Sequence, residues 1–112
     1  MYAEYLRVRG YEVIEVASTD AVIPHMASTD LLITGLLIPG DLFPCDLIEG
    51  AKQGRWGKVV PVVVVTATIV VPLHHAAEAA GADRILLKPC YPDDLLNAVD
   101  AVLDRHSPPI FL

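Results

Sequence analysis

Residues 58–67 read KVVPVVVVTA, the most strand-like segment of this 112-residue chain. Its β-branched residues run without the alternation of apolar and polar positions that a strand with one wet face would show. A strand that is apolar on both faces belongs in the middle of a parallel sheet, with helices covering both sides. The segment therefore predicts an α/β fold.

The rest of the chain alternates between strand patterns and helix patterns. Further strands are predicted at 11–17, at 30–34 and at 83–88. Helices are predicted at 2–9, 21–26, 46–52, 72–80 and 92–103, with Gly or Pro marking several of their ends. Strands that alternate with helices through short loops indicate a doubly wound parallel sheet.

Length and composition narrow the class of protein. A chain of this size forms one domain, which we divide into a core at 1–106 and an extended tail at 107–112. The net charge is −6 and the basic residues are scattered, which argues against nucleic-acid binding. No apolar stretch reaches the roughly 18 residues of a membrane span, and the N-terminus lacks a signal-peptide pattern. We expect a cytoplasmic protein that contacts neither nucleic acid nor membrane.

Cysteine and histidine spacing predicts no metal site. Cys45 and Cys90 show no CxxC pattern and are interpreted as buried or partly buried thiols. His74 and His75 are neighbours on a predicted helix and therefore face different directions.

Five stretches of the sequence together suggest a family. They are GYEVIEVAS at 10–18, DLLITGLLIPG at 30–40, PVVVVTA at 61–67, AGADRILLKP at 80–89 and PDDLLNAVDAVL at 92–103. Their order and content resemble the receiver domain of bacterial response regulators over essentially the whole chain. The joint spacing of Thr66, Asp83 and the Lys88-Pro89 pair makes the match specific. The resemblance implies a flavodoxin-like receiver topology and a role in two-component, or phosphorelay, signal transduction.

The resemblance also implies a particular chemistry, and here the chain departs from it. Such domains phosphorylate an aspartate with the help of Mg²⁺, a hydroxyl group and a lysine. The hydroxyl and the lysine correspond to Thr66 and Lys88, but the phosphoacceptor position is occupied by Gly35. Asp30 begins its strand and Asp41 lies beyond the Pro-Gly turn, so neither is a ready substitute. We expect no phosphorylation and no catalytic residue, hence no enzyme.

The first strand of the family pattern is missing as well. The resemblance implies the strand order 2-1-3-4-5, and this chain starts within what corresponds to the helix after strand 1. The acidic pair that would bind Mg²⁺ is absent with that strand, so the metal site is predicted to be lost and no cofactor is expected. The strands at 11–17 and 30–34 are left with unpaired edges, which is costly.

Three outcomes could resolve the missing strand. The two flanking strands could close up and pair directly, a second copy could supply backbone partners, or the sequence could be a shortened version of a longer product. We expect a homodimer, with exchanged elements as one form of it.

Two further features follow from the resemblance. The Lys88-Pro89 peptide bond is predicted to be cis, as it is expected to be in the family. Ile85 occupies the position of an aromatic switch residue, and an aliphatic side chain cannot report a hydroxyl shift. The contact surface for a histidine kinase or an output domain is predicted at 72–105.

Two other readings remain open from the sequence. The chain could be a small α/β enzyme or ligand-binding protein that uses Thr66, Lys88 and Cys90 around a pocket, although no base lies at a spacing that would activate the thiol. It could also be an ordinary receiver whose true start lies upstream, but Gly35 would still remove its phosphoacceptor.

Overall fold

The computed structural model describes residues 2–104, and the predicted tail at 107–112 lies outside these residues. Three strands form one parallel sheet in the order β1-β2-β3, with bounds Leu32–Thr34, Val62–Thr66 and Arg84–Leu87. Leu32 lies opposite Val62, and Val63 lies opposite Arg84. The predicted parallel α/β sheet is therefore confirmed.

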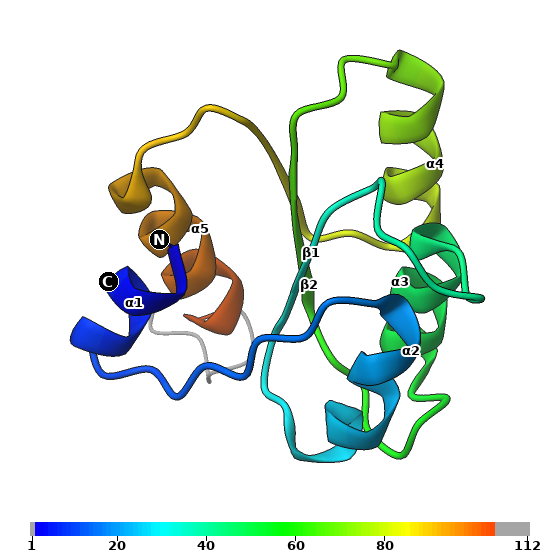
Figure 1. Cartoon of the computed structure of the whole chain (residues 1–112), viewed down its shortest axis with the longest axis horizontal. Coiled ribbons are helices and arrows are strands. Elements are labelled where there is room, and N and C mark those ends of the chain that lie inside the picture. Colours follow the sequence, from blue (N-terminus) through cyan, green and yellow to red (C-terminus); the bar gives the residue numbers. More distant parts are fainter. Residues whose placement is uncertain (1, 105–112) are drawn as a thin grey trace, which may run out of the picture.

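Helices cover both faces of this sheet (Figure 1). Their bounds are Tyr2–Val8 for α1, Thr19–Val22 for α2, Ile23–Ser28 for the 3₁₀ helix η1, Pro44–Gln53 for α3, Val71–Ala80 for α4 and Pro92–Asp104 for α5. One core joins the sheet to η1, α3 and α4, and a second core joins it to α1 and α5. None of the helices within residues 2–104 is long and apolar enough to cross a membrane.

The position of β2 between two cores explains why its sequence is an apolar run. Val62 and Val64 belong to the core beneath α3 and α4, whereas Val63 and Val65 belong to the core beneath α1 and α5. All five residues of β2 are buried. Because successive side chains of a strand point to opposite faces, burial on both faces requires an uninterrupted apolar run.

The strand predicted at 11–17 is wrong. This segment belongs to no helix or strand of the structure, and residues 12–17 make no backbone-to-backbone hydrogen bond within the described part of the chain. The segment does not close up on β1 either, because β1 pairs only with β2. A strand is stabilised by hydrogen bonds to its neighbours, and no strand within residues 2–104 pairs with this segment.

The prediction of a helix at 21–26 is partly correct. Ser18 caps α2 by accepting a hydrogen bond from the Ala21 amide, but the helix lasts four residues and continues as η1. Pro24 lies in the first turn of η1, where its missing amide costs nothing.

One ion pair ties α3 to the start of the sheet. The Asp83 carboxylate accepts hydrogen bonds from the Lys52 ammonium group at 2.9 and 3.1 Å and from the Val62 amide at 2.8 Å. The Lys52 and Asp83 side chains are 25% and 14% exposed, so water competes little for these bonds. The pair therefore holds the beginnings of β2 and β3 against the end of α3.

Replacing Asp83 tests this anchor. Asp83→Ala is expected to lower the free energy of unfolding by about 2 kcal/mol, because a shielded ammonium group and a strand amide lose their shared acceptor. Urea denaturation followed by circular dichroism measures the change. The control is Asp30→Ala, which removes a 2.8 Å ion pair to Lys58 from an aspartate that is 84% exposed, and which should change stability little. Equal losses for the two variants would contradict the assigned role.

Candidate functional site

The carboxyl ends of the three strands place Gly35, Thr66 and Lys88 along one edge of the sheet. The Lys88 amide donates a 2.8 Å hydrogen bond to the Thr66 carbonyl, which joins the ends of β2 and β3. A Cβ atom built on Gly35 would lie 3.5 Å from the Val65 carbonyl oxygen, so Gly35 lies beside the end of β2. Open parallel α/β sheets bind their ligands at this edge.

Position 35 is closely packed as well as lacking a side chain. The Cβ atom built there would lie 3.0 Å from Cδ1 of Ile38, which is closer than ordinary carbon contacts. Any larger residue at this position therefore requires the Ile38 side chain to shift. Gly35 offers no carboxylate, and a side chain at this position would displace the end of the Ile38 side chain.

The two remaining residues of the predicted site differ in accessibility. The Thr66 side chain is buried, and its hydroxyl oxygen accepts a 3.2 Å hydrogen bond from the Thr68 amide. Lys88 is exposed and precedes Pro89 through a cis peptide bond.

The nearby carboxylates do not replace the missing ones. Asp30 is paired with Lys58 at the opposite end of β1. Asp41 lies beyond the turn, where its amide donates a 2.8 Å hydrogen bond to the Asp20 carboxylate. Asp20, in the first turn of α2, was not predicted from the sequence to lie near Asp41. Within residues 2–104, no three His, Cys, Asp or Glu side chains are grouped so that they could hold a metal ion.

The histidine and cysteine candidates make contacts of their own. Nε2 of His74 lies 2.7 Å from the Thr68 carbonyl oxygen. Burial, reinforced by the neighbouring Asp46 charge, raises the pKa of the Cys45 thiol. The Tyr2 hydroxyl donates a 3.0 Å hydrogen bond to the Cys90 carbonyl, and its hydrogen bonding with the Cys90 side chain raises the Tyr2 pKa.

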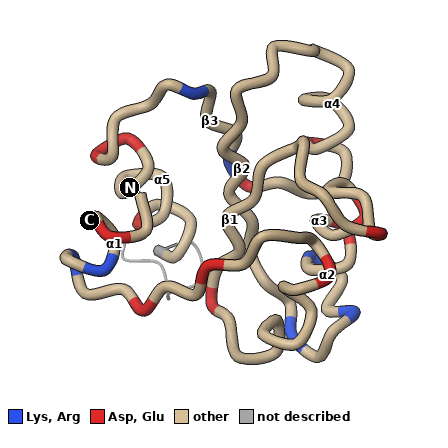
Figure 2. Tube along the Cα trace, in the orientation of Figure 1, with Lys and Arg blue, Asp and Glu red and all other residues tan. Residues whose placement is uncertain are grey.

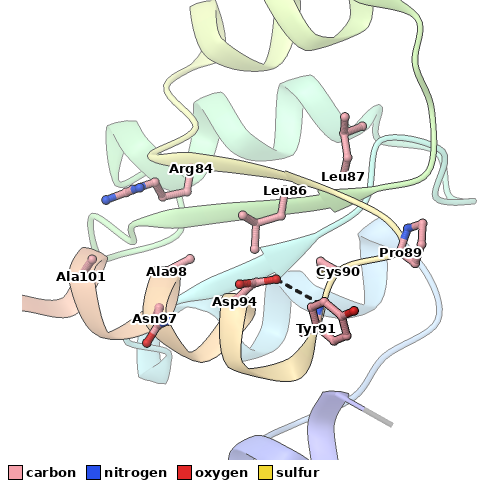
Figure 3. Close-up of a pocket in the computed structure, with 10 residues that line it drawn as sticks. All are labelled: Arg84, Leu86, Leu87, Pro89, Cys90, Tyr91, Asp94, Asn97, Ala98 and Ala101. Atoms are coloured by element: carbon pink, nitrogen blue, oxygen red, sulfur yellow. Dashed lines mark hydrogen bonds between the residues drawn. The ribbon is translucent and has the colours of Figure 1, made fainter.

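Cys90 lines a hollow of about 630 Å³ between β3 and α5 (Figure 3). Leu86 and Tyr91 also line it, and the Tyr91 amide donates a hydrogen bond to the Asp94 carboxylate at 3.2 Å. Neither Thr66 nor Lys88 belongs to this hollow. The three residues of the alternative enzyme interpretation therefore do not surround a common pocket here.

A second hollow, of about 980 Å³, lies between residues 11–16 and 31–35. Lys88 and Gly35 line it at the carboxyl edge of the sheet. We call this hollow the strand slot, because its two walls are the two segments that the sequence analysis expected to flank a missing strand.

A parallel sheet covered by helices on both faces, with a threonine and a Lys-cis-Pro pair at its carboxyl edge, defines a receiver-type α/β domain. Comparisons with known proteins name the family. No family model matches the chain. Among solved structures, a response regulator from Chloroflexus aurantiacus is 31% identical with a TM-score of 0.79, and the match covers 91% of this chain and 84% of that one. A CheY-like receiver domain from Methanospirillum hungatei is 26% identical with a TM-score of 0.81, over 93% of this chain and 82% of that one. The chain belongs to the response-regulator receiver domains of two-component signalling.

The curated relatives are longer proteins. The transcriptional regulatory protein PdtaR of Mycobacterium tuberculosis is 32% identical over 106 residues, which cover 92% of this chain and 50% of PdtaR. BaeR of Escherichia coli is 29% identical over 107 residues, which cover 94% of this chain and 43% of BaeR. The chain thus spans half or less of the curated relatives described here.

Proposed function

We propose that this chain is a cytoplasmic signalling domain that accepts no phosphoryl group and acts through protein contacts, without enzymatic activity. The observation that carries the proposal is Gly35, which lies beside the Val65 carbonyl where the family pattern has its phosphoacceptor. An acyl phosphate forms only on a carboxylate, and Thr66 and Lys88 cannot replace that group.

The surrounding charges support the same proposal. Phosphoryl transfer to a carboxylate needs a cation to offset the charge that develops on the phosphoryl oxygens. The Asp20 carboxylate accepts a hydrogen bond from the Asp41 amide, and Asp30 pairs with Lys58 at the opposite end of β1. The residues present do not fit a Mg²⁺ site, and we propose that the domain works without one.

Incubation with acetyl phosphate and Mg²⁺ tests this proposal. The intact mass of the protein is expected to stay unchanged, while an ordinary receiver domain treated in parallel gains a phosphoryl group. Gly35→Asp is expected to remain unmodified too, because it restores the acceptor without the acids that hold the metal. A stable phosphoryl adduct on the unaltered chain, mapped to Asp20, Asp41 or any other acid, would refute the proposal.

The proposed contact surface is formed by α4, β3 and α5, at 72–105. β3 is an edge strand, because in the described residues it pairs only with β2. Leu87 is 49% exposed and Tyr91 is 78% exposed beside the hollow between β3 and α5. Exposed apolar side chains next to an open strand edge are typical of a protein interface. We propose that a histidine kinase or an output domain contacts this surface. We propose no direct contact with nucleic acid, because the basic residues are spread over several elements (Figure 2).

We also assign a homodimer to this surface, since a twofold axis can bring two β3 edges together. Light scattering at micromolar concentration is expected to give the dimer mass. Leu87→Asp should shift the protein to the monomer, because it places a charge in the apolar contact. Val8→Asp changes a residue of α1 that is 84% exposed and should leave the dimer intact. A monodisperse monomer for the unaltered chain would exclude the dimer.

A further inference from the structure

The loop between β1 and α3, at 35–43, carries two large apolar side chains into solvent. Leu36 is buried in the core beneath α3 and Leu42 is half-buried against that core, so these two side chains anchor the loop. Leu37 and Phe43, which follow them in the chain, are 75% and 74% exposed. Single exposed apolar side chains are common, but aromatic residues are enriched in protein interfaces. Phe43 is therefore a candidate anchor for a partner.

Phe43 also occupies a position at which helices favour a different type of side chain. It is the N-cap residue of α3, and its side chain makes no capping hydrogen bond. Ser, Thr, Asp and Asn are preferred there because an oxygen atom can accept a hydrogen bond from a free amide of the first turn. In α2, the Ser18 hydroxyl accepts such a bond from the Ala21 amide. At α3 the chain forgoes the cap and exposes a ring, and such a departure from local preference is typical of functional positions.

The start of α2 is hydrogen-bonded to this loop and fixes its path. The Thr19 amide donates a 3.0 Å hydrogen bond to the Pro39 carbonyl, and its hydroxyl donates a 2.7 Å hydrogen bond to the Leu42 carbonyl. A Cβ atom built on Gly40 would overlap the Thr19 hydroxyl oxygen, so the two segments approach as closely as glycine allows. A loop held in this way loses little conformational entropy when a partner binds it.

The charge around this loop is negative. Residues 10–51 contain seven acidic residues and neither Lys nor Arg. Asp20 in α2, Asp41 in the loop and Asp46 in the first turn of α3 are exposed, and no ion pair within residues 2–104 engages them. Figure 2 shows acidic and no basic positions along the loop and at the start of α2. An acidic surface repels nucleic acid and anionic lipid and attracts a cationic partner.

We propose that the loop between β1 and α3, with the start of α2 beside it, binds a basic polypeptide segment of another protein. An aliphatic side chain of that segment packs on Phe43 and Leu37, while its Lys or Arg side chains meet the three aspartates. The apolar part of the surface favours a polypeptide over a small polyamine, which has no side chain to cover the ring. This surface lies outside 72–105, so the proposal goes beyond the proposed function and does not depend on the missing phosphoacceptor.

A fluorescent peptide, acetyl-KKLLKKLLKK-amide, tests the proposal by anisotropy titration against the full chain at low salt. Saturable binding is expected, with the changes in amide NMR shifts concentrated at 19–20 and 37–46. Acetyl-KKSSKKSSKK-amide has the same charge without the apolar side chains and should bind about tenfold more weakly. Added salt is expected to weaken binding of the leucine peptide, because it screens exposed charges.

Phe43→Ser separates binding from folding. It removes the ring and supplies a capping hydroxyl, so the leucine peptide should bind about tenfold more weakly while the urea midpoint of unfolding rises. Val8→Ser is the matched control and should bind like the unaltered chain, because Val8 is 84% exposed on α1, which packs on the other face of the sheet. Asp41→Asn should weaken binding about threefold and reduce its salt dependence, whereas Glu4→Gln on α1 should change neither.

Several results would overturn the proposal. They are the absence of saturable binding, equal affinity for the serine peptide, and unchanged affinity in Phe43→Ser. Amide shifts concentrated at 84–98 would place the peptide on the contact surface of the proposed function instead. Displacement of the peptide by an equal concentration of spermidine would reduce the interaction to charge attraction alone. The acetyl phosphate experiment does not involve this loop, so failure of this proposal and failure of the proposed function are distinguishable.

Discussion

The parallel pairing of β2 with strands on both of its sides is the interaction on which the rest of the structure depends. The five residues of β2 are buried, and its valines alternate between the two cores. Because parallel strands all end at the same edge, this pairing also determines that Gly35, Thr66 and Lys88 come together there. The fold and the location of the site thus have a common cause, which is the apolar run of β2.

The same sheet stops one strand short of residues 11–17. β1 has a partner on one side only, and the strand slot occupies the other side. The position that we assign to the phosphoacceptor lies next to the slot, because Gly35 directly follows β1 and lines the slot. The family's chemistry requires carboxylates at this edge, and the chain offers a closely packed glycine and an apolar opening. These features support the role in protein contacts that we propose.

The sequence correctly predicted those helices and strands whose formation depends mainly on residues close together in the chain. The valine run of β2 and the C-terminal helix are each visible within about ten residues. The strand predicted at 11–17 failed because a strand depends on partners far away in the sequence, and alternation alone cannot show that a partner is missing. The Lys52–Asp83 pair spans 31 positions, and the Asp20–Asp41 contact spans 21. Neither contact leaves a local signal. The edge that holds Thr66 and Lys88 could be predicted, since parallel topology alone brings strand ends together.

Residue-resolved amide hydrogen exchange of the free chain tests the central claim most directly, because it reports which backbone groups are hydrogen-bonded within the sheet. The account predicts the slowest exchange at 63–66 in β2, and exchange at 12–16 close to that of an unstructured peptide. Protection at 12–16 equal to that of β2 would contradict it, because the sheet would then continue through the slot.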